Sequence, residues 1–404
     1  MKKNKKKSSF FVNVRKYFFD KFSEQKNDKF SIAEVVVIIF ISILFGAIVG
    51  FVLSSSRPFG TEVSSEVAEI INTYDNIIEN YYGEVSEDEL LNAAVSGMVS
   101  TLDDPYSVFM DRIDTETFNE TVDGTFIGIG ITLEWNNGGF KIVDIISDSP
   151  AEKSGLKAND YIVEIDGDSI ADLDLNDVSK LIKKKEKMSI TVLRGDEKRI
   201  FKVKKGIIEI PSVVSKVLDN NIGYIFIESF ASNTSVQFEE ELSELEKKGI
   251  ESLIIDVRDN PGGRLGQVND ILELFFSKKT ILYQIGNDKE IKKVYSTKKD
   301  KKNYPVAILV NKGSASASEI LAASFQENYK QATIVGTETF GKGTIQKAVE
   351  LSSGASIKYT TQKWLTPKGI WIDGKGIIPD EVVELGDDIN EDKQLEKAVE
   401  ILKK

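Results

Sequence analysis

The chemistry available to this chain is limited first by two residue types that it lacks. None of its 404 residues is a cysteine or a histidine. Cysteine nucleophiles, disulfides, histidine general bases and the usual zinc ligands are therefore excluded together. Any catalysis must use serine, threonine, lysine, tyrosine or acidic side chains.

Three serines lie close together in residues 311–319, between an apolar run and a helix expected from about 318 to 329. A serine at a helix N-terminus lies in a positive local field beside free backbone N–H groups, which favours developing negative charge. The alternative is an ordinary N-cap, which suits Ser318. The spacing does not choose among Ser314, Ser316 and Ser318 as a nucleophile.

A lysine that could act as the base, Lys342, stands between Gly341 and Gly343, with Phe340 adjacent. Without histidine, a neutral lysine is the base that remains for a serine. Its pKa of about 10.4 would have to fall by roughly 3 units, which corresponds to about 4 kcal/mol. Desolvation of the amine in a buried site would supply this free energy. The sequence therefore predicts that Lys342 is buried.

The same segment is close to a P-loop, because Gly336 precedes Gly341 and Lys342 at P-loop spacing, and Asp256 ends a strand as a magnesium ligand would. A P-loop requires Ser or Thr directly after the lysine, whereas Gly343 stands there. The residues that follow alternate between apolar and polar types instead of indicating a helix. A nucleotide-hydrolysing site is therefore disfavoured.

A third loop contains two consecutive glycines, Gly262 and Gly263, directly after a proline. Glycines let backbone N–H groups approach a ligand without obstruction by Cβ, which is the geometry that an oxyanion hole needs. An ordinary tight turn explains the two glycines equally well.

These three loops are positioned by elements that alternate along the chain from residue 207 onward. Apolar runs separated by amphipathic helices, expected over 235–248, 265–276 and 318–329, predict an α/β layer with a substantially parallel sheet. Sites in open α/β sheets form at strand ends, and the three loops follow strands. A closing helix is expected over 391–404.

Two further segments precede this region. Residues 64–110 carry helical apolar spacing, and a capping-box pattern at Ser86 opens the second of two helices. Residues 124–204 consist of short β-rich runs around one helix expected over 175–184. A helical pair and a small β-rich module are therefore predicted.

The N-terminus has the features of a membrane anchor. The first thirty residues hold ten Lys/Arg against three Asp/Glu, and residues 35–53 form an uncharged apolar run. As a helix, this run spans roughly 30 Å, and the basic flank places the N-terminus in the cytoplasm. A cleaved signal peptide and a buried core helix fit less well.

The net charge of −12 argues against nucleic acid as a partner.

Several motifs, in their order along the chain, resemble the C-terminal processing, or tail-specific, serine peptidases, which carry a PDZ domain. The resemblance covers residues 64–402 and rests on LDDPYS, a PDZ signature with GIGI and SPAEKSGL, DVRDNPGG, VNKGSASASEILAA, VGTETFGKGTIQ, TPKGIWIDGKGIIPD and DKQLEKAVEIL.

The resemblance assigns roles by matching position. It implies catalytic Ser316, Lys342 and Gln346, an oxyanion hole of Ala317 with Gly262 or Gly263, and a peptide-binding loop of Gly128, Ile129 and Gly130. It implies no metal and no cofactor. A PDZ-like module binds a peptide C-terminus with backbone N–H groups and pairs the peptide with a strand edge.

The complete expectation is an α/β catalytic core of ClpP/crotonase-like type with a largely parallel sheet, an inserted PDZ domain and an N-terminal transmembrane helix. Substrates would be proteins or peptides with accessible C-terminal tails, cleaved outside the cytoplasm. A homodimer is left open, and the alternative function is a membrane-tethered PDZ adaptor on an inactive peptidase fold. The expected parts are a cytoplasmic tail 1–34, a transmembrane helix 35–54, a helical segment 61–112, a PDZ domain 113–205, a peptidase core 206–385 and a C-terminal helix 386–404.

Overall fold

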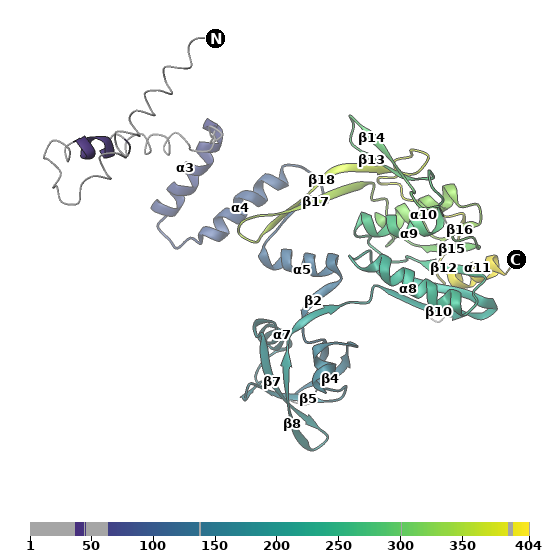
Figure 1. Ribbon diagram of the computed structural model, residues 1–404, viewed down its shortest axis with the longest axis horizontal. Helices are drawn as coiled ribbons and strands as arrows, with labels where there is room; N and C mark the ends of the chain where they lie inside the picture. The colour runs from purple at the N-terminus through teal and green to yellow at the C-terminus, as the bar shows by residue number, and fades with distance from the viewer. Residues whose placement is uncertain are drawn as a thin grey trace, which may run out of the picture. The chain divides into compact units, whose positions relative to one another are not determined.

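The computed structural model describes residues 37–43, 45, 64–136, 139–299, 301–386 and 391–403 (Figure 1). The chain divides into two compact units, Met1–Leu90 and Leu91–Lys404. Among the described residues, no helix is long and apolar enough to cross a membrane. The transmembrane helix expected over 35–54 lies largely outside those residues.

The helical pair expected over residues 64–110 is present as α3 (Ser65–Asn80) and α4 (Glu87–Ser100). Ser86 Oγ accepts a hydrogen bond from the backbone N–H of Glu89 at 3.3 Å, which caps the second helix as its pattern predicted. Neither helix buries a residue in the described part of the chain.

The β-rich module is a small sheet with two helices. Its strand order is β3-β4-β5-β7-β8, with β6 paired to β5, and α7 (Leu175–Lys184) has the bounds that the sequence predicted. Fully buried Phe140, Ile162 and Ile190 form part of its apolar core. Its elements are β3 (Ile131–Asn136), β4 (Gly139–Ile145), α6 (Pro150–Ser154), β5 (Tyr161–Ile165), β6 (Asp168–Ser169), β7 (Lys187–Arg194) and β8 (Glu197–Lys204).

A separate two-stranded ribbon flanks this module in the sequence. Strand β2 (Thr125–Gly128) pairs antiparallel with β9 (Gly206–Glu209), so the chain enters and leaves the module side by side. Helix α5 (Arg112–Asp123) precedes the ribbon and ends at Gly124, which adopts the left-handed conformation with φ 65°.

The central sheet of the core has the order β10-β11-β12-β15-β16-β19. Only the β10–β11 pair is antiparallel, and every other neighbouring pair is parallel. The strands are β10 (Val213–Leu218), β11 (Ile222–Ile227), β12 (Ser252–Asp256), β15 (Val306–Val310), β16 (Ala332–Gly336) and β19 (Glu381–Val382).

Both faces of this sheet are covered, which explains its continuous apolar runs. Side chains alternate between the two faces along a strand. Leu253 and Ile255 pack into the larger core with α8 (Thr234–Lys247), α9 (Leu265–Phe275) and α10 (Ala317–Asn328), whereas Ile254 packs into a smaller core. Helix α11 (Lys393–Leu402) covers that second face and lies beside β12 and β15 in Figure 1.

The expectation of a largely parallel sheet is incomplete, because the core contains a second sheet that is antiparallel. Its order is β1-β18-β13-β14, and β17 also pairs with β18. The apolar-polar alternation after Lys342 belongs to β17, one strand of this sheet. The strands are β1 (Val108–Met110), β13 (Ile281–Gly286), β14 (Ile291–Tyr295), β17 (Thr344–Glu350) and β18 (Ser356–Leu365).

One arginine joins the end of β12 to α11. Arg258 donates from Nη2 to Asp256 Oδ2 at 2.6 Å and from Nη1 to Asp392 Oδ1 at 2.8 Å. Asp392 is also the N-cap of α11. The side chains of Arg258 and Asp256 are 13% and 1% exposed, so this ion pair lies away from solvent.

Removal of this arginine tests how strongly α11 depends on it. The variant Arg258→Ala leaves Asp256 buried without its cation, so we expect a loss of about 3–5 kcal/mol in the free energy of unfolding, measured by urea denaturation. The control Lys247→Ala removes an ion pair whose side chains are 67% and 57% exposed and should change that free energy by less than about 1 kcal/mol. Equal midpoints for the two variants would contradict this account.

Candidate active site

The environments of the three serines before α10 differ. Ser314 and Ser318 are fully buried, and their hydroxyls donate to the carbonyl oxygens of Val257 at 2.7 Å and Asn260 at 2.9 Å. Ser316 is partly exposed, and its hydroxyl donates to no group among the described residues. Of the three, Ser316 is therefore the serine whose hydroxyl is available for a reaction.

The backbone of Ser316 is held in an unusual conformation. Its φ is 55° and its ψ is −108°, which is rare for a residue other than glycine. Ser316 is the N-cap of α10, so its side chain lies where the helix dipole favours negative charge. Strained backbone of this kind occurs often at functional sites.

The two glycines after Pro261 lie against this serine. A Cβ on Gly262 would approach Ser316 Cβ to 2.9 Å and the Ala315 carbonyl oxygen to 2.7 Å, so the close approach requires glycine. The N–H of Gly262 is already donated to Asn260 Oδ1 at 2.9 Å. The N–H groups of Gly263 and Ala317 donate to nothing in the part of the chain that the structure describes.

Lys342 lies in the loop between β16 and β17 and is partly buried, less completely than the sequence predicted. Burial lowers the pKa of Lys342, the nearby charge of Lys358 lowers it further, and the carboxylates of Glu319 and Asp104 oppose this change. Within the described ranges, its amine forms no hydrogen bond to Ser316 or to Gln346. It lies 4.9 Å from the ring centroid of Tyr106.

Gln346 is near this lysine in sequence, but the structure shows no bond between them. Its side-chain amide donates to Thr344 Oγ1 at 2.9 Å and to Thr360 Oγ1 at 3.1 Å. These bonds fix the amide between β17 and β18, where Gln346 is paired with Thr360.

A residue with no role assigned from the sequence, Glu319, joins the serine loop to the lysine loop. Its side chain is fully buried. One oxygen accepts from the N–H groups of Ser316 at 2.7 Å and Lys342 at 2.9 Å. The other accepts from the Thr339 hydroxyl at 2.6 Å and the Gly341 N–H at 2.7 Å.

Two opposing effects act on the pKa of the Glu319 carboxyl, and the net change is upward. Burial raises its pKa, and the four donors oppose that rise because they favour the charged form. The Thr339 hydroxyl oxygen accepts from the Ile377 N–H at 2.7 Å, so its own proton points to Glu319. The N-cap of α10 is Ser316 and not Ser318, the serine that the sequence favoured as a cap. A glutamate three residues after Ser316 is the capping-box pattern that could have indicated this carboxylate.

The peptide-binding loop inferred from the resemblance also has free donors. The N–H groups of Ile129 and Gly130 donate to no acceptor in the described residues, while their carbonyl oxygens accept from Ala151 N at 2.9 Å and Ile146 N at 3.1 Å. Gly130 has φ 81°, and a Cβ there would lie 2.4 Å from Ser149 Cβ. Gly128 ends β2 and pairs with Gly206.

The alternative of a nucleotide site is not supported by the fold. Lys342 is followed by the strand β17, whereas the P-loop lysine opens a helix. Within the described ranges, no three acidic side chains converge as metal ligands.

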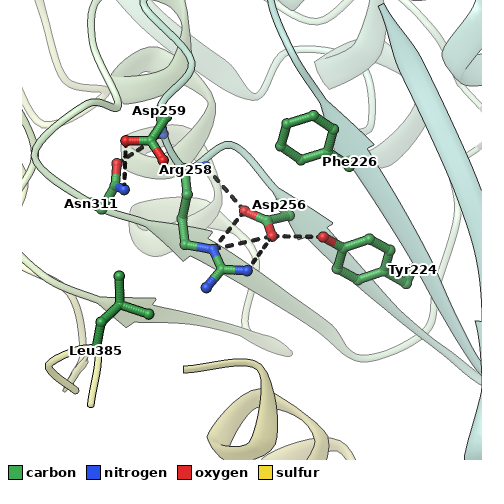
Figure 2. A pocket seen from close by; sticks show the side chains of 7 residues that line it. All are labelled: Tyr224, Phe226, Asp256, Arg258, Asp259, Asn311 and Leu385. Atoms are coloured by element: carbon green, nitrogen blue, oxygen red, sulfur yellow. Dashed lines mark hydrogen bonds and ion pairs between the residues drawn. The ribbon is translucent and has the colours of Figure 1, made fainter. Parts of the chain in front are cut away.

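A cavity of about 220 Å³ lies at the ends of β11, β12 and β15, and it does not include the serine or the lysine. Figure 2 shows that its polar groups already bond to one another: Arg258 and Tyr224 both contact Asp256, and Asp259 contacts Asn311. These contacts satisfy the polar side chains that line it, so the network of side chains joins the ends of the strands.

Three family models match parts of this chain. The model described as peptidase family S41 matches residues 221–383, the PDZ domain model matches residues 128–204, and the model of the activating protease CtpB N-terminal domain matches residues 46–115.

Curated relatives match over most of their length. The carboxy-terminal processing protease CtpB of Bacillus subtilis is 43% identical over 329 residues, which cover 79% of this chain and 68% of the relative. CtpA of the same organism is 36% identical over 359 residues, which cover 87% of this chain and 77% of the relative. A solved photosystem II D1 C-terminal processing protease is 24% identical with a TM-score of 0.48, covering 85% and 98%. The chain therefore belongs to the S41 family of C-terminal processing proteases, which are serine-type endopeptidases.

Proposed function

We propose that this chain is a membrane-anchored S41 peptidase that cleaves extracytoplasmic proteins with Ser316 as nucleophile and Lys342 as general base. One observation carries the assignment of the nucleophile. Among the three serines of the loop, Ser316 is the one whose hydroxyl is not donated to a backbone carbonyl, and it lies against the double-glycine loop at the start of α10.

The first chemical step needs a neutral lysine. Burial lowers the pKa of Lys342, which increases the fraction of neutral amine near pH 7. Lys342 Nζ takes the proton of Ser316 Oγ, and the oxygen attacks the carbonyl carbon of the scissile peptide bond. Because neutral lysine is required, kcat/KM should rise as the pH rises through the lowered pKa.

The negative charge that develops on the carbonyl oxygen needs donors that are not used elsewhere. The N–H groups of Ala317 and Gly263 meet this condition among the described residues, whereas that of Gly262 is bonded to Asn260. We therefore assign the oxyanion hole to Ala317 and Gly263. The Lys342 ammonium returns its proton to the leaving amine, and water then hydrolyses the acyl-enzyme with Lys342 as base again.

Tail recognition is assigned to the PDZ domain. The free N–H groups of Ile129 and Gly130 support binding of a C-terminal carboxylate, and the adjacent strand β3 offers main-chain pairing to the tail.

The anchor is assigned to residues 35–53 from their apolar composition and the basic residues before them. We expect the full chain to remain in the membrane fraction after alkaline carbonate extraction. Protease added to intact cells should cleave a tag placed at the C-terminus but leave one at the N-terminus intact. Release of the full-length chain by carbonate would contradict the anchor.

The dyad is tested with the full chain in detergent and an unfolded reporter protein that has an apolar C-terminus. We expect Ser316→Ala and Lys342→Ala to lower turnover by at least about 1,000-fold, because each removes a group that acts in the transition state. The control is Ser318→Ala, which should keep turnover because the Asn260 carbonyl oxygen retains its bond from Ala315 N at 3.0 Å.

Two results of this experiment would contradict parts of the proposal. Wild-type turnover by Lys342→Ala would exclude lysine as the base. If the wild-type chain binds the reporter without cutting it, the adaptor function is favoured.

A reporter with an amidated C-terminus should be cut less efficiently than one with a free carboxylate, because the PDZ loop loses its charged ligand.

The positioning role of Glu319 is tested with an isosteric change. In Glu319→Gln, an NH₂ group replaces one carboxylate oxygen. This NH₂ group faces N–H or O–H donors, and it cannot accept their hydrogen bonds because it is itself a donor. We expect kcat to fall by about 100-fold with little change in KM, since the serine and lysine loops lose their register. The control is Glu338→Gln, an exposed glutamate in the same loop as Lys342. Equal kcat for both variants would contradict this role.

A further inference from the structure

The motif Leu102-Asp-Asp-Pro-Tyr-Ser107 has no role in the proposed mechanism, yet it brings an aromatic ring to the general base. The Nζ atom of Lys342 lies 4.9 Å from the centroid of the Tyr106 ring. A cation at this distance over a ring face is attracted by the electron-rich π surface.

Hydrogen bonds fix the turn that carries Tyr106. Its backbone N–H donates to Asp104 Oδ1 at 3.1 Å, and the Ser107 hydroxyl donates to Asp104 Oδ2 at 2.5 Å. Ser107 Oγ in turn accepts from the N–H of Thr360 on β18 at 3.1 Å. The turn is therefore fixed to the sheet that also carries β17, the strand directly after Lys342.

Within the described part of the chain, Lys342 Nζ forms no hydrogen bond and no ion pair. Its contact there is with the face of the Tyr106 ring. The charged groups that act on it from the surrounding elements are Glu319 of α10, Lys358 of β18 and Asp104 of the turn. Asp373 also acts on Tyr106. Burial raises the pKa of Tyr106, so its phenol stays neutral over the working range of the enzyme.

We propose that Tyr106 is a positioning residue for the base: its ring face holds the ammonium form of Lys342 beside the Ser316 loop. This inference rests on the proposed dyad. Lys342 becomes an ammonium when it takes the proton of Ser316 Oγ, and the ring stabilises that cation until the proton passes to the leaving amine. The ring therefore acts at the step in which charge separates.

The proposal predicts a change in pH dependence that a purely structural residue would not produce. A ring that stabilises the ammonium makes Lys342 a stronger base. Its removal should lower the pKa of Lys342, so the acidic limb of the kcat/KM profile should move to lower pH. The weaker base should also lower the plateau at high pH. The variant and wild-type curves should approach each other at low pH and separate at high pH.

The test measures pH profiles of kcat/KM with the full chain and the same unfolded reporter. For Tyr106→Leu, we expect the limb to move down by about 0.4–1.5 pH units and the plateau to fall roughly 2- to 30-fold, the range given by cation–π energies. Tyr106→Phe retains the ring and should lie close to wild type.

A matched control is available at a second lysine that contacts an aromatic ring. Lys358 Nζ lies 5.2 Å from the centroid of Phe118. Phe118→Leu makes the same chemical change next to a lysine that is not the base, so the acidic limb should stay in place.

If Tyr106→Leu fails to fold, a second series keeps the ring shape constant. Mono-, di- and trifluorophenylalanine at position 106 withdraw electrons from the ring face progressively, so the limb should move to lower pH step by step. Coincident limbs across this series, with Ser316→Ala and Lys342→Ala inactive, would overturn the role of Tyr106 and leave the dyad intact. An active Lys342→Ala would overturn the dyad itself.

Discussion

Four hydrogen bonds converge on the buried carboxylate of Glu319, and the relative position of the Ser316 loop and the Lys342 loop depends on them. Through the N–H groups of Ser316 and Lys342, one oxygen holds the loop of the proposed nucleophile and the loop of the proposed base together. A buried carboxylate without donors would be costly, so this arrangement is stable only when both loops are folded.

The parallel sheet brings these loops to one edge before Glu319 joins them. Strands β12, β15 and β16 are adjacent and parallel, so the segments after them emerge at the same end. A backbone bond from Phe340 N to Ser314 O, at 3.0 Å, adds to the connection between the loops. Arg258 connects the loop after β12 to Asp392, the N-cap of α11.

Because the sequence contains no histidine, the proposed mechanism depends on the environment of a lysine. Burial and Lys358 lower the pKa of Lys342, whereas Glu319 and Asp104 raise it. The resulting base must be neutral often enough to accept a proton and strong enough to hold it. Glu319 therefore has two effects: it positions the loops, and its charge limits how far the pKa of Lys342 falls.

The sequence by itself determined the alternation of strands and helices, the bounds of α7 and the family resemblance, because apolar periodicity and short motifs are local properties. It also indicated the serine and glycine loops. The spacing left Ser314, Ser316 and Ser318 open, and the resemblance implied Ser316. The physical argument for proposing Ser316 needed the tertiary structure, since the acceptors of Ser314 and Ser318, Val257 and Asn260, come from another loop. The antiparallel second sheet, the engaged N–H of Gly262, and the contacts of Glu319 and Tyr106 likewise depend on partners distant in sequence. Local patterns cannot specify such contacts, because they exist only after the chain has packed.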